Sequence, residues 1–195
     1  MNEGNWKEIH GCRGYFISDR GDCYSVRSNR LLKPMASESY IVYKLLPNGN
    51  KRHHRFSAGR LVLSHFGDTS KLRPFCDHID RDHRNNHISN LRAVNRTINQ
   101  LNRNTRGFST KNETNYVNRS YKTQEGELRS ESRTVESAAL AKEYSEEIRA
   151  RFIRDCFQEI ENRERMEGVR FGRNPAWHAM FKKGLRRRGC RSMFS

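Results

Sequence analysis

The sequence predicts an α+β protein with a small antiparallel sheet near the N-terminus and a helical, basic C-terminal region. Residues 5–56 alternate short apolar runs with turn signals, which is typical of antiparallel strands. After Ser57 the apolar residues recur at spacings of three and four, which is the period of helices. We therefore expect four segments, residues 1–56, 57–107, 108–167 and 168–195.

Two hairpins are expected in the first segment. Tyr15–Ser18 and residues 23–26 predict strands joined by the turn 19–22, and residues 40–46 and 51–56 predict a second pair. Asn48-Gly49 between the latter supplies the positive φ of a tight turn. The second hairpin carries cations that we expect to contact phosphates: Lys44, Lys51, Arg52 and Arg55. A solvated basic edge that resists aggregation is the alternative.

A helix, a strand and a second helix are expected between residues 57 and 107. Ser57 can cap the first helix, whose apolar face is Leu61, Val62, His65 and Phe66. Residues 75–79 predict a strand, followed by a polar loop to Asn90. The second helix has a stripe formed by Leu91, Val94, Ile98 and Leu101. A row of asparagines lies beside that stripe and needs a reason, because asparagine is a mediocre helix former: Asn95, Asn99 and Asn102.

The third segment changes from polar to helical. Residues 109–132 contain few apolar side chains and predict a linker or a very small sheet. From Thr134 to about Arg165 a helical stripe consists of Ala141, Tyr144, Ile148, Phe152, Cys156 and Ile160. From residue 168 we expect an extended basic arm, with Arg186, Arg187 and Arg188 as a nonspecific phosphate contact.

The charge indicates the kind of partner. Thirty-eight Lys and Arg against 22 Asp and Glu give a net charge of +16, and such a chain binds polyanions with release of counterions. A solvated basic surface and an rRNA-associated structural protein are the alternatives. The sequence has no apolar run long enough for a signal peptide or a membrane span, so we expect an intracellular protein that is not secreted. The five cysteines lack a Cys-x-x-Cys pair, which predicts reduced thiols and no zinc ribbon.

The central segment has residues suited to phosphodiester hydrolysis, which needs a base, a cation and help for the leaving oxygen. Asp77 and His78 are neighbours on the expected strand, so they face opposite sides unless a twist or bulge intervenes. Asn99 can bring a neutral oxygen to the same metal ion. Oxygen ligands suit Mg²⁺ or Mn²⁺ better than zinc.

These residues also resemble a known motif. Asp77-His78-Ile79-Asp80, the pair Asn85-Asn86, residues 89–92 and Asn99 are similar to the HNH nuclease motif in its subclass with a third asparagine. The residues upstream resemble the module that precedes this motif in phage HNH homing endonucleases. The resemblance covers about residues 5–107, and the combined order of its residues is highly specific.

The resemblance implies a ββα-metal fold that cuts double-stranded DNA. His78 would activate the attacking water, and Asp77 and Asn99 would hold one divalent ion, Mg²⁺ or Mn²⁺. Asn90, the middle letter of the catalytic motif, would brace the loop and help orient His78. One site per chain implies a nick with 5′-phosphate and 3′-hydroxyl ends. Further expected DNA contacts, beside the basic hairpin and arm, are Arg92, Asn102, Arg103 and Arg106.

Nearby residues are given structural roles. His83 and His87 are the histidines nearest to a site role, because they lie in the loop beside the site. Asp80 and Asp82 are expected to shape that loop, and a second metal ligand is the alternative for Asp80. Three positions depart from the family pattern: Arg81 where glycine is frequent, Gly59 where histidine is frequent and Ala93 where an aromatic is frequent. They bear on packing and DNA contacts rather than on the chemistry.

The remaining expectations concern the C-terminal region, the partners and the rival functions. Gly107 to about Phe152 faintly resembles an AP2-type DNA-binding domain, which implies a three-stranded sheet with a helix; an unrelated helical arm is the alternative. No small-molecule cofactor or membrane partner is expected, and monomer and homodimer both stay open. If phage-encoded, the protein acts in the cytoplasm of a bacterial host. A DNA-binding regulator with a relic nuclease site is the rival function, and an RNA-associated basic protein is the third.

Overall fold

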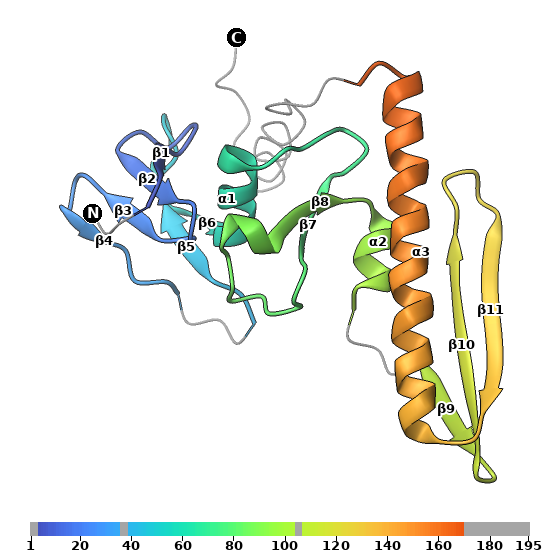
Figure 1. The fold of residues 1–195 in the computed structure, drawn as a ribbon. Coiled ribbons are helices and arrows are strands. Elements are labelled where there is room, and N and C mark those ends of the chain that lie inside the picture. Colours follow the sequence, from blue (N-terminus) through green and yellow to red (C-terminus); the bar gives the residue numbers. More distant parts are fainter. Residues whose placement is uncertain (1–3, 36–38, 104–106, 170–195) are drawn as a thin grey trace. The chain divides into compact units, whose positions relative to one another are not determined.

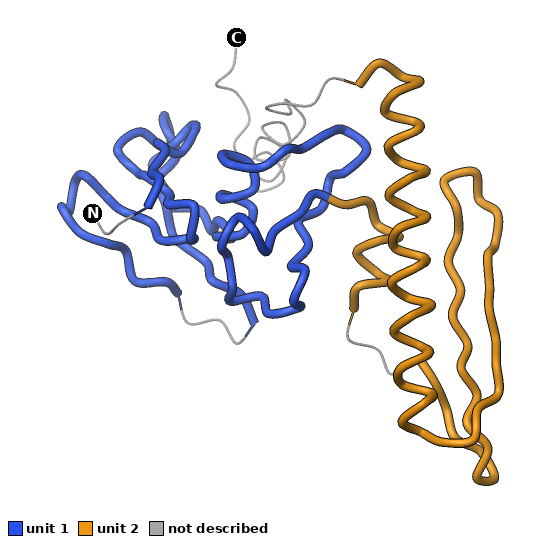
Figure 2. Tube along the Cα trace, viewed as in Figure 1, with its two compact units in different colours: residues 1–93, 171–195 blue, residues 94–170 orange. Residues whose placement is uncertain are grey.

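The computed structural model describes residues 4–35, 39–103 and 107–169. It confirms the α+β class, with several small antiparallel sheets and a few helices (Figure 1). Contacts within the chain divide it into two compact units, one ending at Ala93 and the other beginning at Val94 (Figure 2). This boundary lies inside the expected segment 57–107.

The first unit begins with a four-stranded antiparallel sheet in which each strand pairs with the next along the chain. The hairpin predicted at residues 15–26 is confirmed, with Tyr15 opposite Ser25 and Ile17 opposite Cys23. Its turn contains Gly21 at φ 95°, a left-handed conformation that favours glycine. The strands are β1 Trp6–Glu8, β2 Tyr15–Ser18, β3 Cys23–Ser25 and β4 Arg30–Leu31.

The second hairpin forms a sheet of its own, from β5 Val42–Leu45 and β6 His54–Ser57. The predicted turn is present, since the Asn50 N–H bonds to the Pro47 carbonyl at 3.1 Å, but it does not join the strands directly, because the connection runs from residue 46 to residue 53. Gly49 has a positive φ of 73°, but Asn48 is not among the residues with positive φ. The Asn48 side chain instead accepts a hydrogen bond from the Arg13 backbone N–H at 2.9 Å.

Helix α1, Ala58–Phe66, provides much of the core of the first unit. Leu61, Val62 and Leu63 are almost fully buried in the same cluster as Ile17 and Leu45. The helix begins after Ser57 as expected, but the Ser57 side chain makes no capping hydrogen bond. The backbone N–H of Gly67 bonds to the Leu63 carbonyl at 3.0 Å and ends the helix.

The helix expected from Leu91 onward is a strand followed by a short helix. Strand β7, Phe75–His78, pairs with β8, Leu91–Val94, and α2 covers only Arg96–Leu101. The break occurs at Asn95, whose backbone is extended and whose side chain accepts a hydrogen bond from the Ile98 N–H at 2.9 Å. Apolar residues buried first on a strand and then on a helix produced spacings that imitate one helix.

Two of the three asparagines in the expected row therefore lie at the ends of α2. Asn95 is the N-cap, and Asn102 follows the last helical residue and is buried. Asn99 lies between them on the helix and is half-buried. The expectation that the three form a row along one long helix is wrong, since such a helix does not form.

The second unit consists of α2, a three-stranded antiparallel sheet and a long helix. The strands are β9 Phe108–Lys111, β10 Thr114–Lys122 and β11 Leu128–Val135, in the order β11-β10-β9. Of the two alternatives for residues 109–132, the sheet is confirmed and the linker is wrong. Buried and exposed residues alternate along β10, and α3, Ala138–Met166, packs on the sheet (Figure 1).

Helix α3 begins later than Thr134, because Thr134 and Val135 pair with β10. Ser137 caps the helix by accepting a hydrogen bond from the Leu140 N–H at 3.2 Å. The predicted stripe is buried except at Tyr144, which is half-buried and donates its hydroxyl to Glu131 at 2.7 Å. Ser145 also lies in the buried face and accepts a hydrogen bond from Arg119 at 2.9 Å.

The cysteines of the described ranges are free thiols, as expected. Burial raises the pKa of each to about 12, so these thiols stay protonated and unreactive at neutral pH. They are Cys12, Cys23, Cys76 and Cys156, whereas Cys190 lies outside the described residues. Within those same residues we find no helix with the length and apolar character of a membrane span.

Leu61→Ala is expected to lower the free energy of unfolding of the first unit by about 2–5 kcal/mol, because it leaves a cavity in a core that cannot fully relax. Urea denaturation measures the loss. Leu31→Ala is the control, since Leu31 is 38% exposed on β4, and it is expected to cost less than about 1 kcal/mol. Equal losses from the two variants would contradict the assignment of Leu61 to the core.

Candidate active site

Asp77 and His78 occupy the end of β7 and are both buried, with 6% and 5% of their surfaces exposed. Their side chains find partners on different elements, as expected for neighbours on a strand. Asp77 bonds to Arg92 on β8, and His78 bonds to Asn86 in the loop between the strands. The strand thus presents two chemically different groups, each held by its own partner.

Arg92 orients the Asp77 carboxylate. Its Nε donates a hydrogen bond to Asp77 Oδ2 at 2.9 Å, and its side chain is 24% exposed. A guanidinium at this distance offsets the cost of burying the carboxylate charge. Arg92 was expected to contact DNA, and in the structure its guanidinium bonds to the carboxylate.

His78 is held through one ring nitrogen. Its Nε2 lies 3.1 Å from Asn86 Oδ1, and Asn86 is 4% exposed. Burial lowers the pKa of His78, and the hydrogen bond to Asn86 opposes part of that shift, while nearby His83 adds to it. The neutral imidazole is therefore favoured at neutral pH, and this is the form that can accept a proton.

His83 packs against His78, in keeping with its expected place in the loop beside the site. The two ring centroids are 5.2 Å apart with an edge-on geometry, and His83 stacks on Tyr40 with centroids 4.4 Å apart. His87 has a different role, because its side chain accepts a hydrogen bond from the Ser89 N–H and caps the short 3₁₀ helix η1, Ile88–Asn90. Of the two loop histidines, His83 is the one in contact with the site.

Asn90 ties together the two ends of the loop. Its Oδ1 accepts a hydrogen bond from the Asp80 backbone N–H at 3.0 Å, and its Nδ2 donates to the Asn85 carbonyl at 2.8 Å. The same nitrogen donates to Asp80 Oδ1 at 2.9 Å, while Asp80 Oδ2 accepts from the Asn85 amide at 2.7 Å. These are the bonds of a loop brace, and Asp80 shares in them.

Arg81 adopts a conformation that suits glycine. Its φ is 68°, in the left-handed region where a side chain crowds the backbone. This is the position at which the family pattern frequently has glycine. At this turn Arg81 therefore adopts the left-handed backbone conformation that a glycine would adopt more easily.

The other candidate residues are distributed over both units and beyond. Asn99 lies on α2 in the second unit, Asn102 is buried at the end of that helix, and Arg103 is exposed just after it. Arg106, Arg186, Arg187 and Arg188 lie outside the described residues.

The basic hairpin is exposed. Lys44 and Arg55 are cross-strand partners of β5 and β6, so they share one face of the hairpin. Lys51 and Arg52 are exposed in the connection between the strands. All four cations of the predicted phosphate contact are therefore exposed on the first unit.

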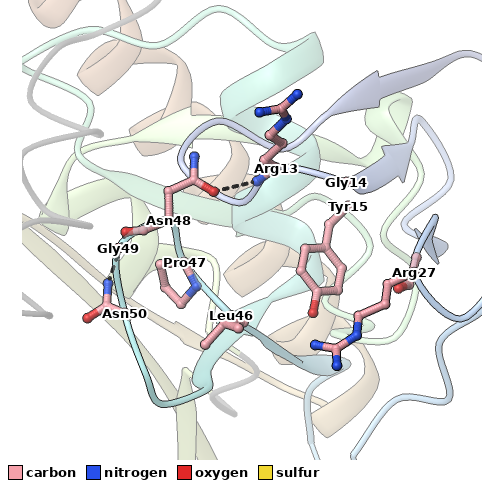
Figure 3. Close-up of a pocket in the computed structure, with 10 residues that line it drawn as sticks. Arg13, Gly14, Tyr15, Arg27, Leu46, Pro47, Asn48, Gly49 and Asn50 are labelled. Carbon is pink, nitrogen blue, oxygen red and sulfur yellow. Dashed lines mark hydrogen bonds between the residues drawn. The ribbon is translucent and has the colours of Figure 1, made fainter.

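A groove of about 280 Å³ lies on the first unit between β2, β3 and the β5–β6 connection (Figure 3). Tyr15 and Arg27 line one part of it and Asn48 to Asn50 line another, with Arg13 above (Figure 3). Arg13 and Arg27 belong to no sequence motif and were not predicted to contact DNA. Asn86 was not predicted to have a role in the site, although the Asn85-Asn86 pair is part of the motif.

Comparisons with known proteins find relatives for part of the chain. It is 34% identical over 104 residues to the DNA endonuclease I-HmuI of Bacillus phage SP01, a match that covers 52% of this chain and 59% of that protein. A solved chain in "DNA binding and cleavage by the HNH homing endonuclease I-HmuI" aligns with a TM-score of 0.46 and 26% identity, over 65% of this chain and 77% of that one. No protein-family model matches.

The sequence match makes this chain a homologue of a phage-type HNH homing endonuclease over the matched part. The resemblance predicted from the motif is thereby confirmed. The chain spans 59% of the length of that relative.

Arg81→Gly is expected to raise the free energy of unfolding by about 0.5–1 kcal/mol, because relief of the left-handed conformation exceeds the added entropy of the unfolded chain. Urea denaturation measures the change. Arg84→Gly removes the same charge from the same loop at a residue outside the positive-φ set, and it is expected to lower stability. A loss of stability in Arg81→Gly would show that its backbone is not strained.

Proposed function

We propose that this chain is a metal-dependent HNH endonuclease that hydrolyses a phosphodiester bond in double-stranded DNA. The observation that carries the proposal is the buried Asp77-His78 pair at the end of β7, with separate partners that orient the carboxylate and the imidazole. This pair lies in a chain that is homologous over 104 residues to a phage DNA endonuclease. Homing, host-DNA attack and packaging are all compatible with this chemistry.

His78 acts as the general base. The burial that lowers its pKa keeps the ring neutral near pH 7, so it can take a proton from water as the oxygen attacks phosphorus. Asn90 braces the loop around it through backbone hydrogen bonds and limits the movement of the strand ends. Hydrolysis leaves a 5′-phosphate and a 3′-hydroxyl.

Asp77 would be the carboxylate ligand of one divalent ion, and the family resemblance implies Asn99 as the second ligand. The described residues contain no cluster of three or more His, Cys, Asp and Glu suited to a metal. Carboxylate and amide oxygens fit Mg²⁺ or Mn²⁺. When bound, such an ion stabilises negative charge on the scissile phosphate and on the leaving oxygen.

DNA binding draws on the net charge of +16. Lys44 and Arg55 on the hairpin, with Lys51 and Arg52 beside them, contact phosphates, and Arg13 and Arg27 at the groove extend this surface. Residues 108–167 act as a second, AP2-like DNA-binding region, and residues 168–195 as a basic arm. One site per chain gives a nick, and two strands are cut only by a dimer.

A DNA-binding regulator with an inactive site is the second candidate. The Asp77–Arg92 hydrogen bond favours it, since a metal ion must share the carboxylate with the guanidinium. The metal dependence of cleavage separates the two candidates.

His78→Ala is expected to slow the nicking of supercoiled plasmid by about 10²–10⁴-fold, because a positioned general base contributes that much. Agarose-gel conversion of supercoiled to open-circular DNA measures the rate, and a gel shift checks that DNA affinity is retained. His53→Ala is the control, since His53 is exposed in the β5–β6 connection, and it should cut at the wild-type rate. Undiminished cutting by His78→Ala would overturn the proposal.

Removal of divalent ions with EDTA is expected to abolish cleavage, and Mg²⁺ or Mn²⁺ is expected to restore it. Asp77→Asn and Asn99→Ala should each raise the ion concentration needed for half-maximal cutting, because each weakens one ligand. Titration of the cleavage rate with Mg²⁺ measures this. A gel shift without cleavage under any divalent ion would favour the inactive regulator instead.

A further inference from the structure

We infer that Asn86 is the positioning residue of His78: it holds the ring in the tautomer that carries hydrogen on Nε2, so that Nδ1 is the atom that accepts the proton. Gly21 and Gly59 supply the narrow slot in which the Asn86 side chain fits. The inference rests on the proposed role of His78 as general base and adds to it the side chain that orients the ring and the two glycines that make room for that side chain.

The tautomer follows from the hydrogen bonds of the Asn86 amide. Its Nδ2 donates to the Arg84 carbonyl at 3.1 Å, and this directs Oδ1 toward His78 Nε2 at 3.1 Å. An amide oxygen has no hydrogen to donate, so this second bond requires a hydrogen on Nε2. A neutral imidazole has only one N–H, which leaves the lone pair of Nδ1 to accept a proton.

The slot around Asn86 has no space for a larger residue at either glycine. A Cβ added at Gly59 would lie 2.8 Å from Asn86 Oδ1 and 3.3 Å from His78 Nε2. A Cβ at Gly21 would lie 2.6 Å from the Asn86 Cβ, and Gly21 also has a φ of 95°. Glycine in a helix is unfavourable relative to alanine. The close approach of Asn86 explains why α1 nevertheless has a glycine at position 59.

The N-terminal sheet fixes one wall of this slot. The buried Tyr43 donates its hydroxyl to the Gly21 carbonyl at 3.0 Å, which holds the β2–β3 turn in place. The Ile88 N–H donates to the Asp19 carbonyl at 2.8 Å, which ties the loop after Asn86 to the same turn. The N-terminal sheet thus helps to hold Asn86, and through Asn86 it helps to hold His78. This role is separate from the contacts with DNA that we propose for the same sheet.

A purely structural role for Asn86 makes different predictions. A residue that only stabilises the loop would, when replaced, lower stability without changing which ring nitrogen of His78 carries hydrogen. Asn85 offers a matched control, because it lies in the same loop and its amide bonds to Asp80, whereas the Asn86 amide bonds to His78. The decisive measurements are therefore the tautomer of His78, the nicking rate and the DNA dissociation constant. A positioning role predicts a change in the first two but not in the third.

The first experiment compares the full-length wild type, Asn86→Ala and Asn85→Ala, each with ¹⁵N-labelled histidine. Long-range ¹H–¹⁵N spectra assigned through His78→Ala should show hydrogen on Nε2 of His78 in the wild type and in Asn85→Ala, and a mixture of tautomers in Asn86→Ala. The nicking rate at saturating enzyme should fall by about 10–100-fold in Asn86→Ala with the DNA dissociation constant unchanged. An unchanged tautomer, or an unchanged nicking rate, in Asn86→Ala would overturn the inference.

The second experiment tests the slot through a double-mutant cycle. Gly59→Ala should slow nicking as Asn86→Ala does, because the new methyl group displaces the amide. The double variant should cut no more slowly than Asn86→Ala alone, since the methyl group then occupies vacated space. Losses that multiply in the double variant would contradict the slot. If Asn86→Ala does not fold, Gly59→Ala provides the tautomer measurement, with the same expected mixture.

The outcomes separate this inference from the proposed function. Loss of nicking in His78→Ala together with normal nicking in Asn86→Ala would remove Asn86 as the positioning residue and leave His78 as the base. Normal nicking in His78→Ala would remove the proposed function, and with it the catalytic meaning of the tautomer.

Discussion

Burying a carboxylate and an imidazole side by side at the end of one short strand is the constraint on which the site depends. Each buried polar group needs a partner, because an unpaired one costs more free energy than a hydrogen bond returns. Arg92 on β8 forms a hydrogen bond with Asp77, and Asn86 in the loop forms one with His78. The strand pairing and the loop conformation are thus needed to give each of the two buried groups a partner.

The loop meets its requirement with polar side chains rather than apolar packing. Asn90, Asn85 and Asp80 bond to one another and to the backbone, and the turn beside them accepts Arg81 in a left-handed conformation. A loop held in this way keeps the partner of His78 in place while the loop surface stays polar. Asn86 lies at its centre, between a turn of the N-terminal sheet and the first turn of α1.

The sequence by itself determined the class of fold and singled out the residues on which the proposed chemistry depends. The β2–β3 hairpin, helix α1, strand β7 and the buried face of α3 follow from local apolar periodicity. Asp77 and His78 stand out because their order with Asn85, Asn86, Asn90 and Asn99 is specific to one motif. The sequence match to a phage DNA endonuclease agrees with that motif.

The tertiary structure decided what periodicity cannot distinguish. Leu91 and Val94 have helical spacing with Ile98 and Leu101, but pairing with β7 makes the first two a strand and leaves Asn95 to cap a shorter helix. The partners of Asp77 and His78, and the slot formed by Gly21 and Gly59, join residues far apart in the chain. Local sequence carries no signal of such contacts, because they depend on how separate elements pack.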